Sequence, residues 1–421
     1  MRLSFDIPAG WTVRRLDEVA EVRSGVAKGR TGLKRPINVP YLRVANVQDG
    51  YLDLDEIKTI EVDEHEVQKY ALREGDVLMN EGGDFDKLGR GHIWRDEIPV
   101  CLHQNHVFAV RPKKEKLDSR FLNLFTGSFH GKLYFLACSK QSTNLASMNS
   151  SQLKAMPIPV PPLGEQKRIA EILGAWDDSI ERVNALIQAK QKLKRALMQQ
   201  LLTGHRRFPQ FKKEKWRSAR LRDVAERVTR KNGTGCSHVL TASGEHGLVD
   251  QAEFFDRAVA SEDLSDYFLL RKGEFAYNRS SMNGYPFGAT KRLERYEEGV
   301  LSILYICFCV DEARANPDFM AHLFDSGLFN RGLRAITQVG ARAHGLLNVT
   351  PSDFMGLEFM LPPLEEQVAI ANALSEAGSE VKGLAAKKGE LEHQKRGLMQ
   401  RLLTGQIRVK VKARAAEVAR A

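Results

Sequence analysis

The sequence lacks any apolar run long enough to cross a bilayer, and it contains few cysteines. No stretch approaches the roughly 18 consecutive apolar residues of a membrane span. The first ten residues, MRLSFDIPAG, lack the apolar core of a signal peptide. The five cysteines are odd in number and scattered, apart from Cys307 and Cys309. We therefore predict a reduced, cytoplasmic chain that has no disulfide framework and no membrane partner.

The usual motifs of catalysis are also missing. There is no Walker A pattern, no HExxH and no GxSxG elbow. Cys101, His103 and His106 have a spacing that superficially suits a metal, but on an extended segment His106 faces away from the other two. Because a complete ligand set is missing, no metal site is predicted.

Methyl transfer to a DNA amine is not expected either. That chemistry needs an Asn or Asp before a Pro-Pro pair and an aromatic residue after it, to grip the exocyclic amine. The pairs Pro161-Pro162 and Pro362-Pro363 are flanked by Val160 and Leu361 before and by leucines after. Scattered carboxylates leave nuclease chemistry neither detected nor excluded. We predict no catalytic residue and a protein that binds and scaffolds.

The composition shows an excess of positively charged residues. The chain of 421 residues has 63 Lys and Arg against 53 Asp and Glu, with a net charge of +10 and a pI near 9.3. This balance favours a polyanionic partner such as nucleic acid, although many basic proteins bind none. The final residues, 406–421, are predicted to form a basic tail.

The chain contains one segment of 44 residues twice. Residues 161–204 and 362–405 align without a gap at an offset of 201, with 18 identities. Both begin with PPLxEQ and end with LMQxLLTG, and similar segments at Trp11 and Trp216 open the region before each. We therefore predict two variable domains, 1–160 and 206–361, that alternate with two helices, 161–205 and 362–405.

Each repeated segment has the apolar spacing of a long helix, and we predict that the two helices pair. Interior glycines at 378, 383, 389 and 397 weaken the second helix, which therefore needs a partner. An antiparallel coiled coil satisfies both copies; the alternative is two separate surface helices, each packed on its own domain. The positions predicted for helix pairing or subunit docking are Ile169, Leu173, Trp176, Ile180, Val183 and Ile187 in the first copy, and Ile370, Leu374, Val381, Leu384, Leu398 and Leu402 in the second.

The variable domains have short apolar runs separated by Gly, Asn and Pro turn signals, which is typical of twisted sheets with a few helices. Expected strands include 76–79, 106–110 and the run 301–310, and expected helices include 121–127 and 318–324. The fold class predicted is therefore α+β, with two globular domains separated by the paired helices.

Polar loops of these domains supply the candidate nucleic-acid contacts. Arg and Lys suit guanine edges and phosphates, Asn and Gln suit adenine, and glycine lets a phosphate approach the backbone. Each residue taken singly is also compatible with ordinary surface loop. The candidates are Arg43, Asn46, Gly82, Gly83, Lys87, Arg90, Lys140, Gln141 and Asn144 in the first domain, and Lys231, Asn232, Ser243, Arg279, Ser280, Asn283 and Arg342 in the second.

The two PPLxEQ and LLTG brackets around variable domains resemble the specificity subunit of type I restriction-modification systems, over essentially the whole chain. Supporting phrases are PYLRVANV at 40–47 and REGDVL at 73–78. The resemblance implies that each variable domain is a target recognition domain that reads half of a bipartite double-stranded DNA target. The helices would fix the gap between the half-sites.

The resemblance also implies partners. Two modification subunits would dock on the helices, bring S-adenosylmethionine and methylate adenine, and restriction subunits with ATP and Mg²⁺ would join them. This chain would hold no cofactor. The alternatives are the recognition part of a fused restriction-methyltransferase, an orphan or anti-restriction DNA-binding protein of the same fold, and a coiled-coil adaptor that binds protein only.

Overall fold

The computed structural model describes residues 7–83, 88–142, 145–244, 246–255, 263–282, 284–337 and 347–411. The chain divides into two compact units. The first comprises residues 1–184 with 387–421, and the second comprises residues 185–386. Each unit therefore holds one variable domain together with parts of the two long helices, α6 (Leu163–Leu201) and α12 (Leu364–Leu403).

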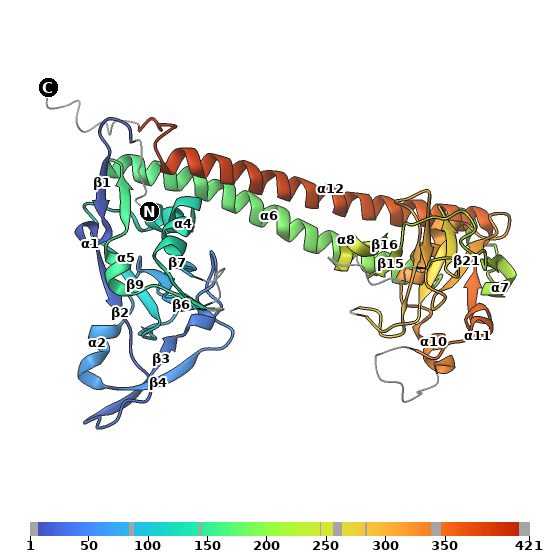
Figure 1. The fold of residues 1–421 in the computed structure, drawn as a ribbon, viewed down its shortest axis with the longest axis horizontal. Helices are drawn as coiled ribbons and strands as arrows, with labels where there is room; N and C mark the ends of the chain where they lie inside the picture. The colour runs from blue at the N-terminus through green and yellow to red at the C-terminus, as the bar shows by residue number, and fades with distance from the viewer. Residues whose placement is uncertain are drawn as a thin grey trace. The chain divides into compact units, whose positions relative to one another are not determined.

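Helices α6 and α12 pack together in opposite directions (Figure 1). In the first unit Lys395 contacts Asp177, and Lys388 Nζ donates to Asn184 Oδ1 at 3.1 Å. In the second unit Lys190 Nζ donates to Glu380 Oε2 at 2.7 Å. Residue numbers rise along one helix as they fall along the other, which confirms the predicted antiparallel pair. Two separate surface helices are therefore excluded.

The predicted apolar positions are buried most deeply where a domain surrounds the helix ends. Ile169 and Leu173 are fully buried and join one core with Leu402. Ile370 and Leu374 are equally buried in the other core, which also contains Leu201. Along the middle of the pair, each helix is covered from one side only, and most of the predicted positions there are half-buried. These are Trp176, Ile180, Val183, Val381 and Leu384, whereas Ile187 is buried. Leu398 is half-buried at the margin of the first core.

The first unit is built on an antiparallel four-stranded sheet with the order β2-β9-β5-β7, against which α1, α3, α4 and α5 pack, whereas α2 packs on the sheet of β3, β4 and β8. A second sheet has the order β4-β3-β8, a third β10-β11-β6, and β1 pairs with β12 at the base of α6. The bounds are β1 Thr12–Arg15, β2 Ala20–Ser24, β3 Pro36–Leu42, β4 Lys58–Asp63, β5 Val77–Asn80, β6 Gly82–Gly83, β7 Gly91–Ile93, β8 Leu102–His103, β9 Val107–Pro112, β10 Lys140–Ser142, β11 Leu145–Ser147 and β12 Pro157–Val160; α1 Leu16–Val19, α2 Val67–Tyr70, α3 Ser119–Gly127, α4 Phe129–Cys138 and α5 Ser150–Lys154.

The second unit repeats this plan with the sheet order β14-β21-β18-β19 and a base pair of strands, β13 and β22. The hairpin β15-β16 and the pair β17-β20 complete it. The bounds are β13 Arg217–Arg220, β14 Ala225–Arg227, β15 Leu240–Ser243, β16 Gly247–Asp250, β17 Phe268–Arg271, β18 Phe275–Asn278, β19 Ala289–Arg292, β20 Glu298–Leu301, β21 Ile306–Val310 and β22 Glu358–Leu361; α7 Leu221–Val224, α8 Gln251–Phe255, α9 Pro317–Asp325, α10 Asn330–Ile336 and α11 Pro351–Met355.

The mixed architecture confirms the predicted α+β class, and one predicted strand is corrected. The apolar run 301–310 is not a single strand, because β20 ends at Leu301 and β21 begins at Ile306. A turn between them leaves Ile303 and Leu304 exposed. An apolar run shows that a segment is rich in strand-forming residues, but it does not show where the chain reverses.

Candidate nucleic-acid interface

In the first unit, backbone pairing brings together two of the predicted loops. Ala146 and Ser147 of β11 pair with Gly83 and Gly82 of β6, and β10, which carries Lys140 and Gln141, pairs with the other edge of β11. Met148 N also donates to Glu81 O at 2.9 Å. Four of the candidate residues therefore lie on one small sheet, although some 60 residues separate them in the sequence.

Asn80 connects this sheet to the other candidates of the first unit. It is 1% exposed, and its Nδ2 donates to Val47 O at 2.9 Å. The backbones of Asn80 and Arg90 are joined by a 2.9 Å hydrogen bond, and Arg90 Nη1 lies 3.4 Å from Gln48 Oε1. The ends of β5 and β7 and the turn at 44–48 therefore form one polar edge.

Beside this edge, the Glu81 side chain forms a hydrogen bond with a residue that the sequence analysis did not select. His106 Nδ1 lies 2.6 Å from Glu81 Oε2, with the His106 side chain more than half exposed. Its partner Glu81 is positioned by backbone bonds on both sides. A carboxylate and an imidazole at a protein surface can accept from, or donate to, base edges.

Arg43 and Asn46 have structural tasks. Asn46 is 3% exposed; its Oδ1 accepts from Arg43 N, and its Nδ2 donates to the carbonyls of Asp53 and Glu56. Arg43 Nη2 donates to the same Glu56 carbonyl at 3.1 Å. These bonds close the turn at 43–56. The turn therefore accounts for the presence of Arg43 and Asn46 without any contact to nucleic acid.

In the second unit, Tyr285 joins the two predicted loops, 241–245 and 278–283. Tyr285 Oη lies 3.4 Å from Gly244 O and accepts from Lys291 Nζ at 2.8 Å. Lys291 also pairs with Asp325 at 2.8 Å. Burial lowers the pKa of Lys291, but Asp325 and Tyr285 outweigh it, so the net shift is upward and the ammonium stays charged. Tyr285 and Lys291 were not among the predicted residues.

Arg279 occupies the place that Glu81 holds in the first unit. Leu347 N donates to Arg279 O at 2.7 Å, as Met148 N does to Glu81 O. The Arg279 side chain donates to the carbonyl oxygens of Leu304 and Val349. Both units thus use the same backbone frame after the central strand, while the side chain on that frame changes from acidic to basic.

The remaining predicted residues of the second unit are divided among several surroundings. The Ser280 backbone N–H donates to Asn278 Oδ1 at 3.1 Å and closes a turn. Ser243 is buried, and its Oγ accepts from His246 N. Lys231 donates to Asp266 O, and Asn232 closes a turn on Cys236. Lys87, Asn144, Asn283 and Arg342 lie outside the described residues.

The metal-like trio Cys101, His103 and His106 is separated. His103 is 2% exposed and donates Nδ1 to Val107 O at 2.6 Å, whereas His106 is at the surface. Burial lowers the pKa of His103 to about 4 and raises that of Cys101 to about 12. Within the described ranges, no three His, Cys, Asp or Glu residues gather as a metal site.

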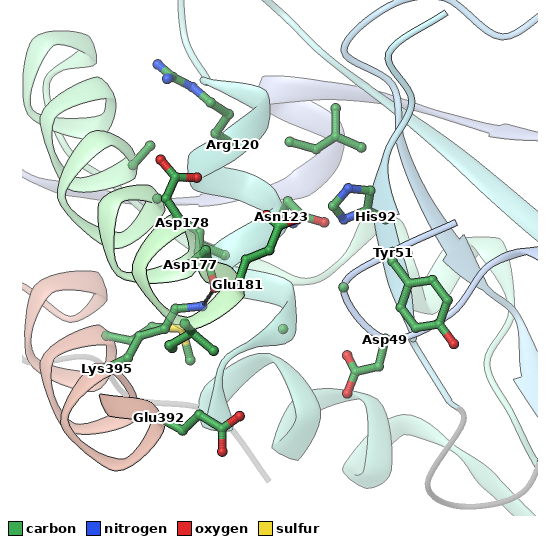
Figure 2. Close-up of a pocket in the computed structure, with 18 of the residues that line it drawn as sticks. Asp49, Tyr51, His92, Arg120, Asn123, Asp177, Asp178, Glu181, Glu392 and Lys395 are labelled. Carbon is green, nitrogen blue, oxygen red and sulfur yellow. Dashed lines mark hydrogen bonds and ion pairs between the residues drawn. The ribbon is translucent and has the colours of Figure 1, made fainter. Parts of the chain in front are cut away.

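A cleft of about 710 Å³ lies within the first unit, between its domain and the helices (Figure 2). Helix α6 lines it with Asp177, Asp178 and Glu181, and α3 lines it with Arg120 and Asn123. The basic residues of its lining are matched by at least as many acidic ones. Such a mixed lining does not favour a phosphate backbone, so the polar edge described above is the better candidate interface.

Sequence reasoning also overlooked a buried polar cluster at the base of each domain. Glu165 accepts from Trp11 Nε1 and from Arg408, and Glu366 accepts in the same way from Trp216 and Arg207. The signal was present, because each arginine stands three residues after the glycine of an LLTG motif. The paired glutamate hydrogen bonds raise the pKa of both arginines further.

The membrane prediction rests on hydropathy, and the structure adds one observation. Across the described stretches, no helix combines the length and the apolar character needed to cross a bilayer. The five cysteines are all free, and Cys101 and Cys307 are buried.

Two α+β domains with the same sheet plan, built around the ends of an antiparallel helix pair, define a class of two-domain proteins. Residues 8–191 match the type I restriction modification DNA specificity domain. Over nearly its whole length the chain is similar to type I restriction enzyme specificity subunits.

Individual relatives and solved structures show the extent of this similarity. The chain is 26% identical to the type I restriction enzyme MjaX specificity subunit of Methanocaldococcus jannaschii, covering 96% of this chain and 95% of that one. It is 24% identical to the MjaVIII specificity subunit of the same organism, covering 96% and 94%. A chain from a type I R-M system shares the fold at a TM-score of 0.60 and 17% identity, covering 96% of this chain and all of that one. The HsdS subunit from Thermoanaerobacter tengcongensis does so at 0.53 and 18%, covering 96% and 99%.

Proposed function

We propose that this chain is the subunit that reads DNA sequence for a type I restriction-modification complex. Each domain would contact one half of a bipartite double-stranded target through the polar edge at the end of its central strands. The paired helices would hold the half-sites at a fixed separation. The chain itself would be non-catalytic, act in the cytoplasm and bind no cofactor.

One observation carries this proposal: the same backbone frame presents different side chains in the two units. Glu81, paired with His106, and Arg279 stand on equivalent backbone positions. A repeated frame suits two encounters with the same double helix, and different side chains suit different base pairs. An adaptor that binds protein only would not require different side chains, such as Glu81 and Arg279, on equivalent backbone positions.

The proposed partners follow from the family. Two modification subunits would bind the helix pair, supply S-adenosylmethionine and methylate adenine in each half-site. Restriction subunits with ATP and Mg²⁺ would complete the complex. The exposed Leu186 and Leu193 of α6 lie seven residues apart, hence on one face of that helix, and support a docking role for it.

Methylome sequencing tests this proposal directly. A host would express the modification subunit encoded with this chain, with and without the chain. We expect a bipartite motif carrying methyladenine in each half, and only when the chain is present. If no motif depends on the chain and it copurifies with no methyltransferase, the orphan, anti-restriction or adaptor alternative replaces this proposal.

A further inference from the structure

A buried carboxylate joins three distant parts of the chain in the first unit. Glu165, in the first turn of α6, has a side chain that is 4% exposed. Its oxygens accept from Arg408 Nε at 2.7 Å, Arg408 Nη2 at 2.8 Å and Trp11 Nε1 at 3.1 Å. Arg408 Nη1 also donates to Ala9 O at 2.9 Å. The Glu165 carboxylate therefore connects the domain, the start of α6 and the segment after α12.

The second unit has the same arrangement. Glu366, in the first turn of α12, is fully buried. It accepts from Arg207 Nε at 2.9 Å, Arg207 Nη2 at 2.6 Å and Trp216 Nε1 at 2.8 Å. In each unit the guanidinium also lies over the indole ring, at 5.8 Å for Arg207 and 5.9 Å for Arg408. We call these two groups the Glu-Arg-Trp clusters.

Such clusters are expensive to disrupt. A buried carboxylate requires compensation by charge and by hydrogen bonds, and removing one partner leaves the other unpaired. The bidentate geometry of arginine also fixes direction, which a surface ion pair does not. Each cluster therefore resists rotation of the domain relative to the helix ends.

The two arginines come from opposite copies of the repeat. Arg207 follows α6 but serves the glutamate of α12, and Arg408 follows α12 but serves the glutamate of α6. Around Arg408, Val409 packs on the core of the first unit, and a Cβ on Gly405 would lie 2.5 Å from Pro8. The first part of the predicted basic tail is thus built into the first domain.

We infer that Arg408 and Arg207 are positioning residues that fix the angle of each target domain on the helix pair, and that they thereby make recognition strict about the distance between half-sites. This inference rests on the proposed function. On the proposed function, base reading falls to the polar edge of the first unit and to the loops around Arg279 and Tyr285 in the second, and the clusters consist of other residues. Loosening a cluster should relax the spacer requirement without changing which half-sites are read.

The test measures DNA affinity of the full chain assembled with its modification subunits. Probes carry the motif found by methylome sequencing, the same motif with its spacer altered by one base pair, or the motif with one half-site scrambled. For Arg408→Ala and for Arg207→Ala we expect the preference for the correct spacer to fall by about tenfold, because each change leaves a buried carboxylate without its bidentate partner. The preference for each intact half-site should remain.

Matched variants separate positioning from folding and from charge. Lys410→Ala and Arg206→Ala remove the same charge from exposed neighbours and should behave as the original protein. Arg408→Lys keeps the charge without the bidentate fork and should recover part of the spacer preference. Where Arg408→Ala does not fold, Glu165→Gln, which keeps an acceptor for Trp11, replaces it with the same expectation.

Two results overturn the inference. The first is an unchanged spacer preference in the arginine variants. The second is the loss of a half-site preference together with the spacer preference, because that result would show that the arginines only stabilise the domain. A failure of the proposed function looks different, since the unaltered complex would then show no preference among the probes.

Discussion

At the scale of the residue, the structure assigns many polar side chains to support rather than to recognition. Asn46 and Asn232 use their amides to close turns, and Gln166 joins α6 to the loop before α3 through Lys116 O and the Asp118 amide. The equivalent Gln367 accepts from the Asn316 amide. The Glu-Gln pair in each PPLxEQ motif therefore serves the joint between helix and domain.

One buried histidine makes stability depend on pH. His103 is held neutral, with a pKa of about 4 caused mainly by burial, against an ordinary value of about 6.5. As the pH falls below about 6.5, the unfolded chain takes up the proton first, so stability is lost between about 6.5 and about 4. The full loss amounts to about 3 kcal/mol.

Thermal unfolding between pH 7 and pH 5 measures this effect. The melting temperature of the original protein should fall more steeply with pH than that of His103→Asn, which has no imidazole at this position. The other histidines contribute to both proteins alike. Parallel slopes for the two proteins would show that His103 does not contribute.

At the scale of the element, α12 is a continuous helix of 40 residues despite its glycines. A Cβ built on Gly383, Gly389 or Gly397 meets no atom within 4 Å, whereas Gly378 lies beneath Lys194. Most of these glycines are therefore not required for packing against α6. The helix persists because its two ends are embedded in domain cores and because α6 covers one face.

A glycine substitution in α12 should stabilise the protein. Gly389→Ala places a methyl group in open space and should raise the free energy of unfolding by about 1 kcal/mol, because alanine loses less backbone entropy in a helix. Gly405→Ala is the matched opposite, since Gly405 has φ +77° and its Cβ would lie against Pro8. Denaturant unfolding checks both; a destabilising Gly389→Ala would mean that the open space is needed.

At the scale of the whole molecule, a duplicated unit is assembled so that each helix contributes to both halves. The start of α6 and the end of α12 share one core, and the end of α6 and the start of α12 share the other. Each half therefore depends on chain segments from both copies. This arrangement gives the proposed ruler its physical basis, since neither helix can shift along the other without disturbing a core.

Shortening both helices should shorten the spacer. Removing residues 186–189 from α6 and 383–386 from α12, which lie opposite each other in the antiparallel register, keeps the pairing on either side. Four residues correspond to about 6 Å of helix, slightly under two base pairs. Methylome sequencing should find both half-sites unchanged with fewer base pairs between them; altered half-sites would contradict the ruler.

The sequence by itself determined the duplication, the two long helices and the α+β character of the domains; it predicted the antiparallel pairing of the helices, which the structure confirmed against the alternative of separate helices. These properties follow from repetition and from apolar periodicity, which are written along the chain. Only the tertiary structure decided which segments meet. It brought β6 to the hairpin of β10 and β11, joined Arg408 to Glu165, and placed Tyr285 between two loops. Such contacts depend on how surfaces pack between residues far apart in sequence, and no local pattern specifies them.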